Sequence, residues 1–229
     1  MYYKLSDPYY LNPYMRHSSS RKRSINARSL KVVGNDSVKA SPDMANVILG
    51  VQTENTDLKI AQNENAIITT KVINALTSIG ISEKNINTDS YSIEPQYDYV
   101  DGKQIFRSYK VINSIRIITK AINNVGQIVD TATANGANIV NSITFSLSDT
   151  TPYYRKALNL ALEDALMKAR TISNNLGVIL DEIPINVIEE NYNITPSVER
   201  KTLTATASTP IMPGQIDITA RINATFNYE

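Results

Sequence analysis

Residues 88–121 read TDSYSIEPQYDYVDGKQIFRSYKVINSIRIITKA, and this stretch decides the fold. Asp101-Gly102 is a strong signal for a tight hairpin turn, because both residues tolerate the left-handed backbone that such a turn requires. Along the second arm, alternate residues of 111–117 fall on one face, as in a strand packed against a core. Pro95 lacks a backbone N–H, so the first arm is expected at a sheet edge or at a bend. The stretch therefore predicts a long antiparallel hairpin.

A helix is predicted on each side of this hairpin. Asp57 can cap a helix over 58–79, in which apolar residues recur every three or four positions before Gly80. A second helix is predicted over about 122–135. Strands are expected before the first helix and after the second, over 43–55 and 138–148.

The third helix is the clearest element of the chain and is predicted over 152–176. Asp149 offers a cap, Pro152 suits the first helical position, and Gly177 can end the helix. One apolar ridge is expected to form its buried face, flanked by three alanines. The ridge is Leu158, Leu162, Leu166, Ala169, Ile172 and Leu176, and the flanking residues are Ala157, Ala161 and Ala165.

The remaining strands come from the two ends of the chain. Residues 29–40 contain short apolar runs, with turn chemistry at Gly34-Asn35-Asp36 between them. After the third helix we expect a strand over 182–190, a long loop or weak strand over 195–214, and an alternating strand over 214–229. The element order is β-β-α-β-β-α-β-α-β-β. This order predicts an α+β fold with mostly antiparallel sheets and three helices.

Charge is unevenly distributed along the chain. Residues 1–28 hold six basic residues and one acidic residue, a net charge of +5, together with five of the thirteen tyrosines. Since the whole chain carries +1, residues 29–229 carry about −4. We therefore predict a basic, Tyr-rich N-terminal tail over 1–28 and one domain over 29–229. The tail residues with the clearest binding chemistry are Tyr9, Tyr10, Tyr14, Arg21, Lys22 and Arg23.

The basic cluster of the tail lacks the apolar run and cleavage site of a signal peptide. No stretch reaches 18 apolar residues, so the sequence predicts no membrane-spanning helix. These features predict a cytoplasmic protein. Deposition in an envelope or spore layer by a non-classical route stays open as the alternative.

The composition excludes several kinds of catalytic and metal site. The chain has no cysteine and one histidine, which excludes thiol nucleophiles, cysteine-containing zinc sites and multi-histidine metal sites. No phosphate-binding glycine motif occurs. Glu163 and Asp164 are interpreted as part of an ion-paired helix face, because basic residues lie within two turns of them. We predict no catalytic residue, no metal and no cofactor.

Several segments, in one order, resemble the SIMPL-domain family. They include SPDMANVILGVQTEN (41–55), AQNENAIITTKVINALTSIGI (61–81), SYKVIN (108–113), VGQIVDTATANGANIVNSITFSLSD (125–149) and ALEDALMKARTISNNLGV (161–178). The family includes kinase-interacting SIMPL proteins and bacterial periplasmic immunogenic and oxidative-stress-defence proteins. The resemblance covers roughly residues 29–229. It implies an α+β domain without an established catalytic site, with envelope, stress or protein-binding roles and channel-like assembly in one periplasmic member.

Aromatic residues cluster around the predicted hairpin. Five residues form the candidate interface with a protein partner, namely Tyr97, Tyr99, Phe106, Arg107 and Tyr109. Aromatics are favoured at protein contacts. Two alternatives are a stacking platform for a nucleic acid or sugar and ordinary cross-strand pairing.

The leading hypothesis is a non-enzymatic protein that acts by homo-oligomerisation, as a ring or channel-like assembly, and by protein binding. One alternative is a binder of nucleic acid, an acidic polymer or a membrane surface through the basic tail. The other is an enzyme that uses a carboxylate or tyrosine in a cleft that the sequence does not reveal.

Overall fold

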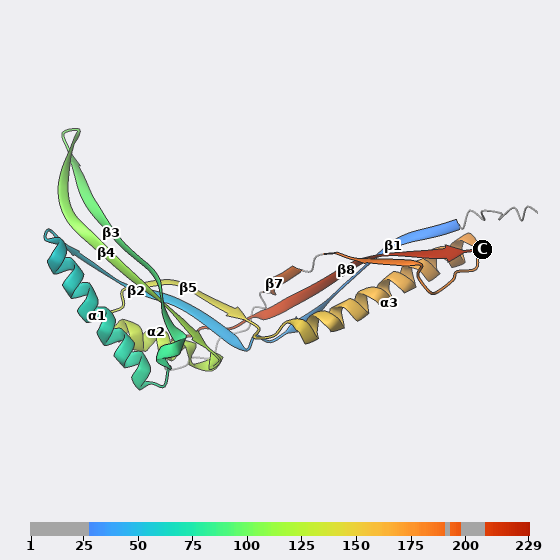
Figure 1. Ribbon diagram of the computed structural model, residues 1–229, viewed down its shortest axis with the longest axis horizontal. Coiled ribbons are helices and arrows are strands. Elements are labelled where there is room, and N and C mark those ends of the chain that lie inside the picture. The colour runs from blue at the N-terminus through green and yellow to red at the C-terminus, as the bar shows by residue number, and fades with distance from the viewer. Residues whose placement is uncertain (1–27, 191–192, 198–208) are drawn as a thin grey trace, which may run out of the picture.

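The computed structural model describes residues 28–190, 193–197 and 209–229 as an elongated molecule with two lobes (Figure 1). It confirms the predicted α+β class and element order, and adds one short strand, β7, where a loop or weak strand was expected. In chain order the strands and α-helices are β1 (Arg28–Ala40), β2 (Met44–Asn55), α1 (Leu58–Ser78), β3 (Ile86–Val100), β4 (Lys103–Thr119), α2 (Val125–Ala134), β5 (Ile139–Ser146), α3 (Thr151–Leu176), β6 (Asn186–Glu189), β7 (Asn193–Ser197) and β8 (Gln215–Tyr228).

The hairpin lobe, residues 44–146, contains an antiparallel sheet in the order β3-β4-β2-β5. Strand β3 is at the edge of the sheet, as Pro95 predicted. The tight turn is also confirmed, because Asp101 and Gly102 have φ angles of 50° and 75°. Helices α1 and α2 pack against β2, and the buried residues of this lobe are mostly Val, Ile and Leu. The largest of them are Val47, Leu49, Val51, Val72, Leu76, Ile117, Val125 and Ile128.

Helix α1 is positioned by two polar side chains. The carboxylate of Asp57 accepts hydrogen bonds from the N–H groups of Lys59 (2.7 Å) and Ile60 (3.3 Å), which confirms the predicted cap. Asn65 is buried, and its amide donates to the carbonyls of Val51 (2.8 Å) and Val111 (3.2 Å). These bonds attach the helix to two neighbouring strands of the sheet.

The long-helix lobe contains β1, β8, β6 and β7, with α3 on one face of its sheet (Figure 1). Strand β1 pairs with one edge of β8 along its whole length, and β6 and β7 pair with the other edge. Helix α3 contacts β1 and β8 through a stripe of alanines four residues apart. These are Ala157, Ala161, Ala165 and Ala169, packed on Val32, Ala220, Ile222, Ala224 and Phe226.

Two predictions for this lobe need correction. The predicted ridge of α3 is buried only in part, since Ala169 is fully buried and Leu158 and Leu166 pack against the core. Leu162 and Ile172 are each 37% exposed, and Leu176 is 61% exposed. A turn does not form at Gly34-Asn35-Asp36, since β1 runs unbroken through it. Gly34 instead meets the helix, where an added Cβ would lie 2.0 Å from the carbonyl oxygen of Ala161. Alanine and glycine let the helix approach the sheet closely, which leaves the leucines toward the rim.

Candidate binding surfaces

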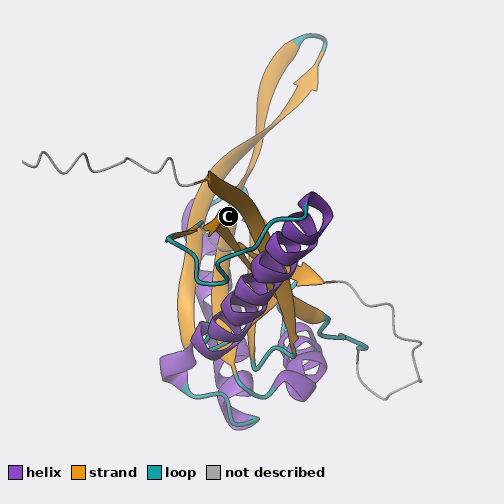
Figure 2. Ribbon diagram, turned by 90° about the vertical axis from the view of Figure 1, so that its right-hand side faces the viewer, coloured by secondary structure: helices purple, strands orange, loops and turns teal. Residues whose placement is uncertain are grey.

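The end of the β3–β4 hairpin projects beyond the rest of its sheet (Figures 1 and 2). Strand β2 pairs with β4 only as far as Asn55, which faces Tyr109. Beyond this point residues 96–108, here called the distal hairpin, form a two-stranded ribbon that no third strand of the described chain joins. A two-stranded hairpin is at best marginally stable in water by itself. Contact with another surface would therefore stabilise it.

A bulge gathers three aromatic rings on one face of the hairpin. The register shifts beside Tyr97, which pairs with Phe106, so that Arg107 is the extra residue of β4. In a regular strand, residues three apart point to opposite faces, but the extra residue brings Phe106 and Tyr109 to the same face. The ring centroid of Phe106 lies 4.9 Å from that of Tyr109 and 6.0 Å from that of Tyr97. The sequence pattern did not reveal this bulge.

Large side chains are exposed on both faces of the distal hairpin. Tyr97 and Phe106 are 43% and 42% exposed, and Tyr99 is 75% exposed. Ile105, next to Phe106 and so on the opposite face, is 50% exposed, and Val100 is 51% exposed. The candidate interface therefore includes two apolar residues that the sequence analysis missed.

Arg107 lies between the distal hairpin and the end of β2. Its guanidinium is 3.5 Å from the carboxylate of Asp98 in the hairpin and 3.5 Å from that of Glu54 in β2. Tyr109 is half-buried at the same junction. Exposed ion pairs contribute little to stability, so the contact with Glu54 links the base of the distal hairpin to β2 only weakly.

A second exposed apolar surface lies in the long-helix lobe. Residues 179–190 read ILDEIPINVIEE and are here called the acidic strip, since they contain four acidic residues and no basic one. The sequence analysis predicted an ordinary strand over 182–190, but only Asn186–Glu189 pair as β6. Five large apolar side chains of the strip are exposed, from 43% to 77%. They are Ile179, Ile183, Ile185, Val187 and Ile188.

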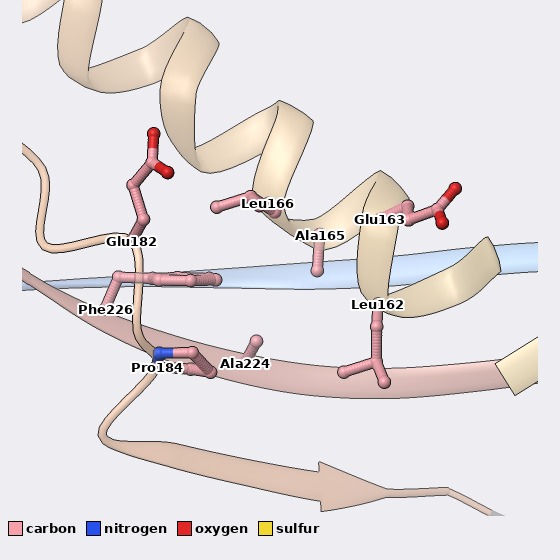
Figure 3. Close-up of a pocket in the computed structure, with 8 residues that line it drawn as sticks. All are labelled: Leu162, Glu163, Ala165, Leu166, Glu182, Pro184, Ala224 and Phe226. Atoms are coloured by element: carbon pink, nitrogen blue, oxygen red, sulfur yellow. The ribbon is translucent and has the colours of Figure 1, made fainter. Parts of the chain in front are cut away.

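A shallow groove of about 220 Å³ lies between α3 and this strip (Figure 3). Helix α3 provides Leu162 and Leu166, β8 provides Phe226, and the chain ahead of β6 provides Pro184. The carboxylates of Glu163 and Glu182 are the charged groups among its lining residues. The groove is thus apolar, with acidic residues among those that line it. Leu162 and Leu166, which the sequence analysis predicted to be buried, line it.

Several described carboxylates have a pKa below its usual range. Hydrogen bonds from the hydroxyl and N–H of Ser148 lower the pKa of Asp43, and those of Thr209 lower the pKa of Asp130. The hydrogen bond from Arg170 likewise lowers the pKa of Glu182. These carboxylates are held ionised, whereas a general acid needs a raised pKa. Across the described residues, no cluster of three or more His, Asp or Glu side chains could hold a metal ion.

The predicted site residues fall into two groups. The structure brings Tyr97, Phe106 and Tyr109 together, with Tyr99 and Arg107 on the same hairpin. The tail residues Tyr9, Tyr10, Tyr14, Arg21, Lys22 and Arg23 lie outside the described residues.

The fold and its surfaces define an α+β protein with a projecting aromatic hairpin. The chain belongs to the family described as SIMPL, a protein of unknown function (DUF541), which it matches over residues 30–226. It is 25% identical over 166 residues to the uncharacterized protein YggE of Escherichia coli K12, covering 72% of this chain and 68% of that protein. It is 26% identical over 209 residues to the 26 kDa periplasmic immunogenic protein of Brucella melitensis, covering 86% and 83%.

The predicted cytoplasmic location is wrong. The match to relatives named as periplasmic, in Brucella melitensis and Brucella abortus, points to the periplasm or envelope. The prediction failed because it inferred a location from patterns not found in the sequence, and an absence does not place a protein in any compartment. No helix among the described residues is long and apolar enough to cross a membrane.

Proposed function

We propose that this chain is a non-catalytic envelope protein that assembles with copies of itself through the distal hairpin. The observation that carries the proposal is the two-stranded ribbon at 96–108, which has exposed apolar side chains on both faces. A monomer rarely leaves such a surface in water. Burial between neighbouring subunits would shield both faces and stabilise a ribbon that is marginal by itself.

The shape of the molecule supports assembly by a repeating contact. The hairpin lies toward one end of an elongated chain, and the long-helix lobe forms the other (Figure 1). If the hairpin contacts a different surface of its neighbour, the contact repeats from copy to copy and gives a ring when the rotation closes. The envelope location in the proposal is supported by the names of the Brucella relatives. The stress-related role that the family resemblance implies stays a prediction.

The test is the mass of the purified assembly. We expect Tyr97→Ser combined with Phe106→Ser to lower the mass measured by light scattering, because it removes two of the three clustered rings. The circular dichroism spectrum should be unchanged, since both side chains are exposed. The matched control is Ile60→Ser with Ile67→Ser, two exposed apolar residues of α1. If the hairpin variant keeps the wild-type mass, the hairpin is not the interface.

A further inference from the structure

The acidic strip, residues 179–190, is an exposed surface that needs a partner of a particular chemistry. It combines five exposed aliphatic side chains with a net charge of −4. Two of its carboxylates are already paired, Glu182 with Arg170 at 2.8 Å and Glu190 with Arg221 at 2.9 Å. Asp181 and Glu189 form no ion pair among the described residues, although Glu189 accepts a hydrogen bond from the hydroxyl of Tyr154 through one of its two oxygens. A complementary partner would present apolar area and positive charge together.

The N-terminal segment starts beside this strip. Arg28, the first described residue, pairs with Tyr228 of β8, and Tyr228 forms a bridge on its other side to Leu180. The N–H and carbonyl of Ile179 also bond to Glu229. Neighbouring strands lie about 4.8 Å apart. The segment before Arg28 therefore leaves the sheet about 10 Å from the start of the strip.

The sequence of that segment complements the strip, because it carries positive charge and large apolar side chains. Residues 1–28 carry a net charge of +5, with most of the cations in 16–28, and five tyrosines and two leucines in 1–15. Tyrosine suits such a contact, since it buries a large apolar ring and still offers a hydroxyl. The groove of about 220 Å³ beside Leu162 and Phe226 has room for such a side chain (Figure 3).

We propose that residues 1–27 fold back onto the acidic strip and the adjoining groove of the same chain. The basic residues then lie along Asp181 and Glu189, and tyrosines of the first half cover the strip's aliphatic side chains. Reach is ample, because the 14 residues from Tyr14 to Arg28 can span up to about 46 Å when extended. The covalent connection favours the chain's own strip, since it keeps the segment at an effective concentration on the order of millimolar. This inference does not depend on the proposed function.

The absence of cysteine makes the contact directly testable in the full chain. We would introduce Tyr10→Cys with Ile185→Cys, oxidise at micromolar protein concentration, and measure the intramolecular disulfide by mass spectrometry. The matched control is Tyr10→Cys with Thr171→Cys, since Thr171 is exposed on α3 two positions from buried Ala169 and so points away from the sheet. We expect about tenfold more intramolecular disulfide in the first variant.

Charge provides the second arm of the test. Adding Asp181→Asn and Glu189→Gln to the first variant should reduce the disulfide yield several-fold, and so should salt at about 1 M, where the screening length falls to about 3 Å. Equal yields in the Ile185 and Thr171 variants would overturn the proposal. So would disulfides found between chains rather than within them, because the segment would then contact a neighbouring copy.

Discussion

The two lobes differ in how their helices pack on their sheets. In the hairpin lobe, Val72 and Leu76 of α1 are buried among Val, Ile and Leu of β2 and β4. In the long-helix lobe, α3 presents alanines to the sheet and meets Gly34 in β1 at very short range. Helix α1 therefore contributes large side chains to its contact with the sheet, whereas α3 contributes alanines that pack on large side chains of β1 and β8.

This difference explains why apolar side chains are exposed in the groove beside α3. A helix seated on alanines directs the leucines beside them toward the edge of the contact with the sheet, because residues adjacent in sequence point about 100° apart. Leu162 and Leu166 thus line the groove beside the acidic strip. The close packing that stabilises the long-helix lobe also creates a surface that can bind a partner.

The largest expected effect separates a core leucine from a rim leucine. Leu76→Ala should lower the free energy of unfolding by about 2–5 kcal/mol, because it removes buried area and leaves a cavity. Leu162→Ala should cost no more than about 1 kcal/mol, since the side chain is 37% exposed and its neighbours already border solvent. Urea denaturation of both variants measures the difference. Equal losses would show that the rim of α3 is as tightly packed as the core of the hairpin lobe.

An intermediate effect is expected at Gly34. Gly34→Ala places a Cβ against the backbone of Ala161, and backbone cannot rotate away as a flexible side chain could. The helix must shift from the sheet, at a cost of about 1–3 kcal/mol. Lys31→Ala, at an exposed position of the same strand, should stay within about 0.5 kcal/mol of wild type. A Gly34 variant with wild-type thermal stability would show that the close approach is not required.

Local signals in the sequence were enough to predict most elements of the fold. The Asp101-Gly102 turn, the Asp57 cap and the edge position of β3 each depend on one or two residues and are confirmed. The buried face of α3 could not be chosen in the same way. Leu158, Leu162 and Leu166 recur with the same spacing as the alanines one position before them, so periodicity fits both stripes. The contact with Gly34 decides between them, and it joins residues more than 120 positions apart.

The candidate surfaces were predictable to different degrees. The aromatic residues near the hairpin turn were visible in the sequence, but the bulge at Arg107 that puts Phe106 beside Tyr109 was not, because alternation alone cannot locate an extra residue. The acidic strip looked like an ordinary strand because its apolar residues suit one. The sequence did contain a signal for an exposed binding surface, since residues 179–190 combine six aliphatic side chains with four acidic residues and no basic one.

The outer edge of β1, in the long-helix lobe, is bound by charged side chains of α3. Asp164 on α3 accepts a hydrogen bond from the N–H of Asn35 at 2.9 Å, and Lys168 donates to the carbonyl of Val33 at 3.0 Å. Asp164 and Lys168 also pair with each other at 2.6 Å. Charged side chains that occupy the free groups of an edge strand discourage pairing with another chain. The ion-paired face predicted for α3 thus has a defined structural role.

This contact makes stability depend on pH in one direction. Burial tends to raise the pKa of Asp164, but the hydrogen bonds from Lys168 and Asn35 outweigh it and hold the pKa below its ordinary value of 3.8. The carboxylate therefore stabilises the fold above pH 3.8, and this contribution is lost as the pH falls through the lower folded value. Asp164→Asn should lower the free energy of unfolding by under about 1 kcal/mol at pH 7. The difference from wild type should shrink as the pH falls below 3.8. Urea denaturation across this range measures the loss.

Glu163→Gln is the matched control, because it removes the same charge from the next residue, which lines the groove instead of binding β1. If Glu163→Gln shows the same pH-dependent loss, general charge on α3 and not the contact with β1 accounts for the effect.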